Sequence, residues 1–297
     1  MMDNAIAAVC RRCEQGMDAG EIEPAMTDFV ATLACTRAAL DAPEWRVAAA
    51  TFGAHAVHRL FLNDPYTANA YRKGRGYAGD ADTLDFVYRY RAAPPDTSPL
   101  GRRLFQITTD VPIACAVRAR CRYLGDRIAS LRAARPDAII VSVACGHMRE
   151  LEGLEWPSGG GAIYGLDHDP ATIERLTRLH AGAVIARRTS VRRILTHPET
   201  VPQADMIYAA GLFDYLDDRT AALLIRRLRA RLLPRGSLIL TNLTQRNGEI
   251  AYMEAIMDWW MVYRDEADLR GLVRGDAAAV RTCSVMDGRL ACLELQA

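Results

Sequence analysis

A small-residue turn and an acidic residue are spaced in this chain as they are in nucleoside-binding proteins. The apolar run 139–143 ends in Ala144, Cys145 and Gly146, and a second apolar run ends on Asp167, about 20 residues after the turn. In an open parallel sheet, ligands bind at the carboxyl ends of the strands, where small residues let the backbone approach them closely. An acid at the end of the second strand can accept hydrogen bonds from ribose hydroxyls. The pattern predicts a site for a cofactor that contains adenosine.

The turn favours a cofactor without phosphate groups. Only Gly146 remains of the G-x-G-x-x-G pattern that lets the backbone approach a pyrophosphate, and the chain has no G-x-x-x-x-G-K sequence. S-adenosylmethionine (SAM) carries ribose and adenine but no phosphate, so it fits better than NAD or FAD. We predict that His147 touches the methionine part of SAM or the acceptor, with a plain helix-start residue as the alternative. The predicted cofactor contacts here are Ala144, Cys145, Gly146, His147, Asp167 and His168.

Two further strand ends supply predicted contacts. Ser190 and Val191 follow the third strand and would flank the adenine, although Ser190 could equally cap the next helix. The fourth strand ends in the segment 208–215, whose small residues let a ligand pass over the strand end; plain packing is the alternative. The cofactor contacts predicted in this segment are Tyr208, Ala209, Gly211 and Tyr215.

Several sequence segments resemble those of a known family. The longest is Asn63-Asp-Pro-Tyr-Thr-Ala-Asn-Ala-Tyr-Arg-Lys-Gly-Arg-Gly-Tyr-Ala-Gly-Asp80, and shorter ones lie at 116–118, 211–216 and 260–264. From about Asp64 onward the chain resembles the bacterial class I SAM-dependent methyltransferases that include makers of 3-hydroxy fatty acid methyl ester signals. Where that family often has an acid on the first strand and glycines around the turn, this chain has Ser142, Ala144 and Met148. The resemblance implies a SAM site under a helical N-terminal cap.

The loop from Arg75 to Asp80 carries chemistry of its own. Two glycines within it suit a tight or closely approached backbone. Arg75 could bind a carboxylate through its planar fork, Tyr77 could meet a sulfonium, and Asp80 could accept from an amine. The alternative is a rigid turn between helices in which the arginine and the aspartate pair with each other.

Two reactions fit these residues. In methyl transfer to a small organic acid or similar acceptor, the protein aligns an acceptor with the breaking C–S bond, and a neutral acceptor also needs a base. Some proteins similar to the family are azetidine-2-carboxylate synthases, in which the α-amine of SAM attacks its own γ-carbon and expels methylthioadenosine. A third hypothesis is an inactive SAM-binding module. The predicted catalytic residues are Tyr77, Asp80, His147 and Asp214.

The elements that must position these residues follow from hydrophobic periodicity. Residues 1–93 read as helices, 91–99 as a proline-rich linker, and 101–135 as a long helix bent near Pro112. From 138 onward, strands and helices alternate, which predicts βαβ units and a doubly wound, mostly parallel α/β sheet of Rossmann-like type. The predicted strands are 138–144, 161–166, 183–187, 204–210 and 236–242, and the predicted helices are 148–155, 170–180, 217–232 and 249–258. The segments 279–286 and 289–296 flank Asp287-Gly288 and predict an antiparallel hairpin. We expect a helical cap or substrate domain over 1–135 and a SAM-binding domain over 136–297.

Composition narrows the class of protein. The formal net charge of +1 gives no reason to expect a nucleic-acid partner, and no apolar run reaches the ~18 residues that span a membrane. Eight cysteines without a small-scaffold pattern suit a reducing cytoplasm, and no secretory leader is expected. The pair Cys10 and Cys13 has no second pair to complete a metal site, so no metal is predicted. We expect a cytoplasmic enzyme of specialised (secondary) metabolism with a small-molecule substrate. The sequence leaves open whether the chain forms a homodimer.

Overall fold

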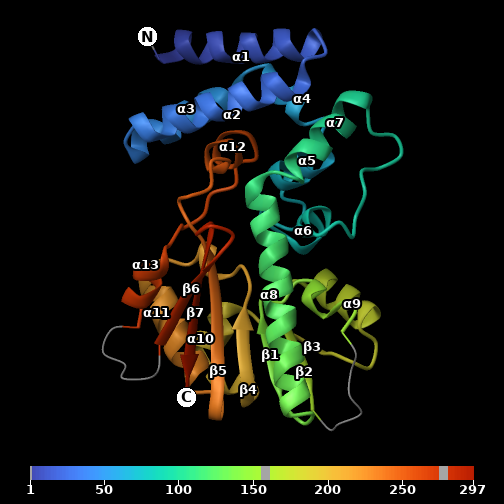
Figure 1. The fold of residues 1–297 in the computed structure, drawn as a ribbon, viewed down its shortest axis with the longest axis vertical. Helices are drawn as coiled ribbons and strands as arrows, with labels where there is room; N and C mark the ends of the chain where they lie inside the picture. Colours follow the sequence, from blue (N-terminus) through green and yellow to red (C-terminus); the bar gives the residue numbers. More distant parts are fainter. Residues whose placement is uncertain (1, 155–160, 274–279) are drawn as a thin grey trace. The chain divides into compact units, whose positions relative to one another are not determined.

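The computed structural model describes residues 2–154, 161–273 and 280–297. The chain forms two compact units, Met1–Cys115 with Asn247–Trp260, and Ala116–Arg246 with Met261–Ala297 (Figure 1). We call them the helical unit and the sheet unit. The expected assignment of residues 1–135 to a cap or substrate domain and of residues 136–297 to a SAM-binding domain stays a prediction.

The helical unit confirms that the N-terminal part of the chain is helical. Its aromatic core centres on Phe29, whose ring centroid lies 6.0 Å from that of Phe52 and 5.0 Å from that of Phe61. Its helices are α1 (Met2–Asp18), α2 (Ile22–Ala39), α3 (Ala42–Ala54), α4 (Val57–Phe61), α5 (Pro65–Arg72), α6 (Ala81–Val87), α7 (Pro99–Thr108) and α12 (Ile250–Ile256).

Helix α12 was expected among the βαβ helices but packs against α2 and α3 instead. Its buried Glu254 explains this placement. The carboxylate accepts hydrogen bonds from Arg37 Nε at 2.7 Å and from Trp45 Nε1 at 2.6 Å. A buried carboxylate needs such partners, and α2 and α3 supply them.

The prediction of one continuous, bent helix over residues 101–135 is wrong. The structure has two helices, α7 and α8 (Pro112–Ala134), separated at Thr109–Val111. Proline cannot donate a backbone hydrogen bond, and its ring clashes with the carbonyl four residues earlier. Pro112 therefore starts a new helix where the sequence pattern suggested a kink.

The sheet unit confirms the predicted mostly parallel sheet with an antiparallel C-terminal hairpin (Figure 1). The strand order is β3-β2-β1-β4-β5-β7-β6, with the first five strands parallel and β7 antiparallel to both β5 and β6. The strands are β1 (Ile140–Val143), β2 (Ile163–Asp167), β3 (Ile185–Arg188), β4 (Ala204–Ala209), β5 (Leu232–Leu243), β6 (Val280–Val285) and β7 (Leu290–Gln296). Residue 279 of the predicted first hairpin strand lies outside the described residues.

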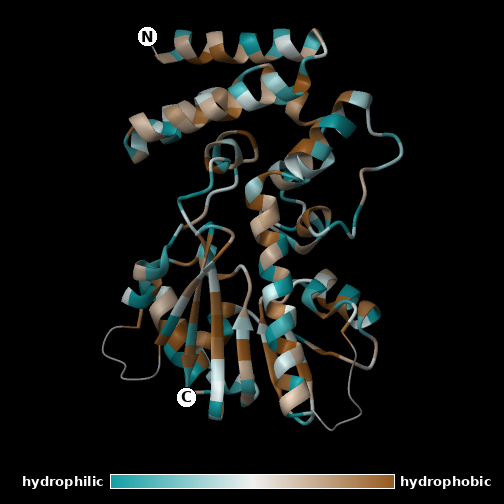
Figure 2. Ribbon diagram, viewed as in Figure 1, coloured by the Kyte–Doolittle hydropathy of each residue, from teal (hydrophilic) through white to brown (hydrophobic). Residues whose placement is uncertain are grey.

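Alternation along the strands divides the sheet's core into two faces. On one face, α8 and α9 (Pro170–Leu179) bury Leu124 and Leu176 against Ile140 of β1 and Tyr208 of β4. On the other face, apolar side chains of the strands pack against α10 (Val191–Thr196), α11 (Asp218–Arg229) and α13 (Glu266–Gly271). Figure 2 shows the apolar segments of the central strands in brown. Short 3-10 turns lie at Arg149–Leu151, Pro198–Thr200 and Phe213–Tyr215.

The helix predicted at 148–155 is wrong over its described residues. Only a single 3-10 turn, Arg149–Leu151, follows β1 before residue 154. Met148 and Gly153 have φ angles of 49° and 75°, in the left-handed region that ends a right-handed helix. The apolar spacing of this segment reflects burial in the core rather than a helix.

None of the described helices is long and apolar enough to cross a membrane.

Candidate functional site

The turn after β1 has left-handed backbone at alternate residues. Ala144, Gly146 and Met148 have φ angles of 52°, 54° and 49°. The backbone N–H of Cys145 donates to the Leu166 carbonyl at 3.1 Å, which extends the β1–β2 pairing past the strand end. The turn is therefore held against β2.

Gly165 of β2 makes room for this turn. A Cβ at this position would lie 2.5 Å from Leu176 Cδ2, 2.9 Å from Met148 Sδ and 3.1 Å from Cys145 Sγ. The first two separations are shorter than real Cβ contacts, so a larger residue at this position would force the side chains of Leu176 and Met148 to shift. Burial raises the pKa of the Cys145 thiol well above its usual value, which keeps the thiol neutral.

Asp167 ends β2 beside the turn, as predicted. One oxygen of its carboxylate accepts from the Gly146 N–H at 3.0 Å, and the other accepts from the Asp169 N–H at 3.1 Å. The His168 Nδ1 atom lies 3.3 Å from Asp167, and the His168 side chain is 55% exposed. The structure thus brings the predicted acid, turn glycine and histidine together at one strand end.

His147 lies in the turn with a buried side chain. Its backbone carbonyl is 3.0 Å from the His180 Nε2 atom, so a residue just after α9 helps to fix the turn. The predicted contacts of His147 with SAM or the acceptor stay predictions.

The end of β3 adjoins the same edge. The Thr189 N–H donates to the Asp167 carbonyl at 2.7 Å. Ser190 caps α10 by accepting from the Arg193 N–H at 3.2 Å, which is the alternative that the sequence left open. Val191, the first residue of α10, packs against the core. The adenine contacts predicted for Ser190 and Val191 stay predictions.

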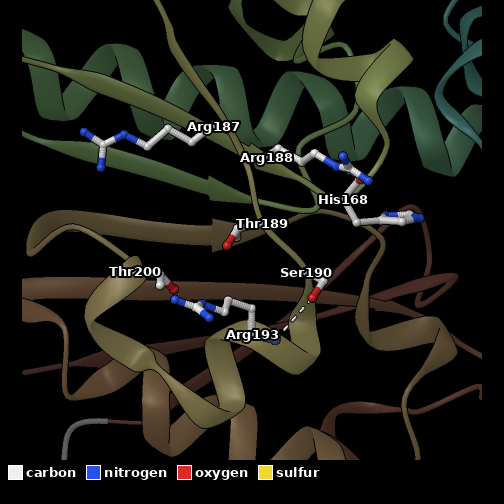
Figure 3. A pocket seen from close by; sticks show the side chains of 7 residues that line it. All are labelled: His168, Arg187, Arg188, Thr189, Ser190, Arg193 and Thr200. Atoms are coloured by element: carbon white, nitrogen blue, oxygen red, sulfur yellow. Dashed lines mark hydrogen bonds between the residues drawn. The ribbon is translucent and has the colours of Figure 1, made fainter.

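An open pocket of about 780 Å³ lies at this edge (Figure 3). None of its described lining residues is acidic. Arginine side chains make the pocket positively charged, and hydroxyl groups add hydrogen-bonding partners. Arg188 Nε donates to the His168 carbonyl at 3.2 Å, which fixes one wall. The lining residues are His168, Arg187, Arg188, Thr189, Ser190, Arg193 and Thr200.

Tyr208 of β4 is fully buried and points into the core. Its hydroxyl donates to Glu150 Oε1 at 2.6 Å. Burial raises the pKa of Glu150, since desolvation of the carboxylate outweighs this hydrogen bond. The structure gives Tyr208 a packing role, and its predicted contact with a cofactor stays a prediction.

A buried arginine that the sequence analysis missed lies at the end of β4. Arg120 of α8 is 3% exposed, and its Nη1 atom lies 3.9 Å from an Asp214 carboxylate oxygen. A Cβ on Gly211 would lie 3.2 Å from the same Nη1 atom, so the glycine leaves space for the guanidinium. The sequence did contain a signal: Arg120 falls at helical spacing between the buried residues Ala116 and Leu124, where a charge is rare unless it is paired.

Asp214, a predicted catalytic residue, is buried and structurally engaged. It accepts a 2.7 Å hydrogen bond from the Leu243 N–H of β5. Burial raises its pKa to about 7, although Arg120 counteracts part of that rise. Ala209, at the end of β4, is buried, whereas Tyr215 is 40% exposed.

The predicted loop residues lie in the helical unit. Asp80 is 1% exposed and caps α6 by accepting from the Thr83 N–H at 2.7 Å. Arg75 pairs with Asp82 rather than with Asp80. Gly76 has a φ angle of 92°, which explains one glycine of the loop. The predicted catalytic and cofactor contacts of Arg75, Tyr77 and Asp80 stay predictions.

Solved structures share this architecture. A protein from Bordetella parapertussis, described as a possible exported protein, is 18% identical, with a TM-score of 0.63, over 100% of this chain and 96% of that one. The CurJ carbon methyltransferase is 13% identical, with a TM-score of 0.52, over 82% of this chain and 69% of that one. No family model matches the chain, and no curated protein matches it either. Together with the strand order, these likenesses establish a fold that a methyltransferase also adopts.

Proposed function

We propose that this chain is a SAM-dependent enzyme that transfers the methyl group of SAM to a small organic acid. The observation that carries the proposal is the Asp167 carboxylate at the end of β2, hydrogen-bonded to the Gly146 N–H of the adjoining turn. This is the position from which an acid accepts from ribose hydroxyls in nucleotide-binding sheets.

The residues after β1 fit a nucleoside without phosphate groups. A pyrophosphate is usually held by the N-terminus of a helix that follows the first strand. Up to residue 154, the described chain has only the 3-10 turn Arg149–Leu151 at this place. The left-handed backbone at Ala144, Gly146 and Met148 also differs from a helix start. NAD and FAD would therefore lack their usual support here.

The fold supports the same conclusion. Dinucleotide-binding sheets of the common type continue with a parallel sixth strand in the order 3-2-1-4-5-6. Here β7 lies antiparallel between β5 and β6. The CurJ carbon methyltransferase is similar in fold to this chain, with a TM-score of 0.52.

An acidic acceptor is favoured by the environments of two predicted bases. Asp80 caps a helix through the Thr83 N–H, and Asp214 accepts from the Leu243 N–H. Both carboxylates are buried, and each has a structural role through one backbone N–H. A carboxylate acceptor is already ionised at neutral pH and needs no strong base to be activated.

In this proposal, Asp167 holds the ribose hydroxyls, and the turn around Gly146 lets the cofactor approach the backbone. SAM supplies an electrophilic methyl group when bound. The protein's own contribution is to orient the acceptor carboxylate in line and to exclude water, which supplies up to about 7–11 kcal/mol in well-oriented systems.

Mass spectrometry of small molecules tests the reaction. The purified chain is incubated with SAM alone and then with SAM and a panel of organic acids. We expect S-adenosylhomocysteine and a methyl ester only when an acid is present. Methylthioadenosine and a four-membered cyclic amino acid from SAM alone would instead establish the cyclase, and SAM binding without turnover would favour a binding module. Asp167→Ala is the control and should lose product under the same conditions.

A further inference from the structure

Two cysteines face each other across the C-terminal hairpin. Cys283 of β6 is the register partner of Cys292 of β7, and the two strands are antiparallel. Directly opposed residues in such a pair have Cα atoms about 4.5 or 5.5 Å apart and side chains on one face. A disulfide requires a Cα separation of roughly 4.4–6.8 Å. Either kind of pairing therefore brings the two thiols within bonding reach.

The two thiols differ in their access to solvent. Cys283 is exposed, whereas Cys292 is 0% exposed. An exposed thiol can meet an oxidant, and a shielded thiol beside it can attack only the sulfur of its neighbour. This division suits an attacking and a resolving cysteine.

The surroundings favour the thiolate at the exposed position. A hydrogen bond from the Cys292 thiol lowers the pKa of Cys283, and the same contact raises the pKa of Cys292. The Cys283 Sγ atom also lies 4.0 Å from the Tyr123 hydroxyl oxygen. Since the thiolate is the nucleophile, Cys283 is the cysteine that reacts first.

A disulfide between Cys283 and Cys292 would lie at the edge of the sheet. Among the described strands, β6 ends the strand order and pairs with β7 alone, whereas β7 pairs with β5 as well. A covalent link at the register pair would fasten the edge strand to a strand inside the sheet.

We propose that Cys283 and Cys292 are a thiol-modification site that closes to a reversible cross-strand disulfide. With a low-molecular-weight disulfide such as oxidised glutathione, the Cys283 thiolate attacks one sulfur and releases one glutathione thiolate. The Cys292 sulfur then attacks Cys283 Sγ, and its proton goes to the departing glutathione thiolate, which leaves as the second glutathione. The two protein thiols lose two electrons in all, and oxidised glutathione is reduced to two thiols. The site is independent of the proposed methyl transfer.

Peptide mapping tests this directly. Arg281 and Arg289 are trypsin sites, so Cys283 and Cys292 fall in separate peptides, 282–289 and 290–297, with one cysteine each. The folded chain is treated with oxidised glutathione, then unfolded in excess iodoacetamide so that a free Cys292 is also blocked, digested and analysed by mass spectrometry. We expect a linked pair of these peptides that disappears after reduction. Two alkylated peptides, or a stable glutathione adduct on Cys283, would overturn the proposal.

Three variants sharpen the result. Cys283→Ser, a change at an exposed position, should abolish the link and leave Cys292 without a glutathione adduct. Cys292→Ser should retain glutathione on Cys283, because the resolving thiol is gone. Cys35→Ser removes an exposed thiol of the helical unit and should leave the link unchanged. A glutathione adduct on Cys292 in Cys283→Ser would contradict the assignment of Cys283 as the cysteine that reacts first, even if Cys292→Ser fails to fold.

Discussion

Two buried aspartates, one in each unit, are used in different ways. Asp64 of the helical unit is 0% exposed and caps α5. Its carboxylate accepts from the Tyr66 N–H at 2.9 Å, the Thr67 N–H at 3.1 Å and the Thr67 hydroxyl at 2.6 Å. The Thr108 hydroxyl donates a fourth hydrogen bond at 2.8 Å. A carboxylate has roughly four acceptor positions, so Asp64 is saturated by the protein itself.

The Asp167 carboxylate of the sheet unit can accept further hydrogen bonds. Its backbone donors among the described residues are the Gly146 and Asp169 N–H groups, with His168 Nδ1 at 3.3 Å. Burial of an acid therefore does not by itself indicate function. The number of acceptor positions that the protein already uses separates an acid that builds the fold from one that can accept from a ligand.

The largest expected effect is on the saturated acid. Asp64→Ala leaves several buried donors without an acceptor, and each costs about 1–3 kcal/mol. We expect the free energy of unfolding to fall by about 4 kcal/mol, measured by urea denaturation.

Asp41→Ala is the matched control for Asp64→Ala, since Asp41 also caps a helix of this unit, α3, but is exposed. Its loss should be about 1 kcal/mol. Equal losses for the two variants would remove the distinction between a saturated and an ordinary cap.

A smaller effect follows from the pKa of Asp214, which burial raises to about 7. The unfolded value is near 3.9, so between pH 4 and pH 7 the folded protein holds a proton that the unfolded chain lacks. Stability from this group is complete below pH 4 and is lost as the pH rises to 7. The expected loss between pH 5 and pH 7 is about 2 kcal/mol.

Urea denaturation at pH 5, 6, 7 and 8 measures this dependence in the wild type and in Asp214→Asn. The asparagine carbonyl can still accept from the Leu243 N–H, but the side chain does not titrate. The variant's stability should therefore fall less steeply up to pH 7. A variant that follows the wild-type curve at every pH would exclude Asp214 as the source.

The smallest effect concerns Ser190, which the structure uses as a cap. Ser190→Ala removes the acceptor for the Arg193 N–H and should cost about 1 kcal/mol of stability. SAM affinity should stay within about threefold of the wild type, less than 0.7 kcal/mol, by calorimetry. A larger drop in affinity at unchanged stability would support the predicted contact of Ser190 with adenine.

Much of the sheet was predictable because alternation of strand and helix is a local pattern. The acid at Asp167 was found for the same reason, since a strand end and its spacing from a turn are visible in the sequence. The apolar spacing after β1 could not show that a 3-10 turn forms there in place of the expected helix. Glu150 turns inward to meet Tyr208, and only the folded chain shows that contact.

Tertiary partners decided the other differences. Helix α12 follows β5 in sequence but joins the helical unit, because Glu254 bonds to Arg37 and Trp45 more than 200 residues away. Arg120 was overlooked because an arginine in a helical pattern usually indicates a solvated helix face. Its position on a buried helix stripe was the available evidence.

The affinity of SAM for Asp167→Ala, measured by calorimetry beside the wild type, tests the central claim most directly. Hydrogen bonds to a charged group contribute about 1.5–3 kcal/mol, so the variant should bind SAM at least about tenfold more weakly. Asp169→Ser, which keeps a capping side chain at the start of α9, should bind SAM like the wild type. Unchanged affinity in a folded Asp167→Ala variant would contradict the ribose contact and the proposed function built on it.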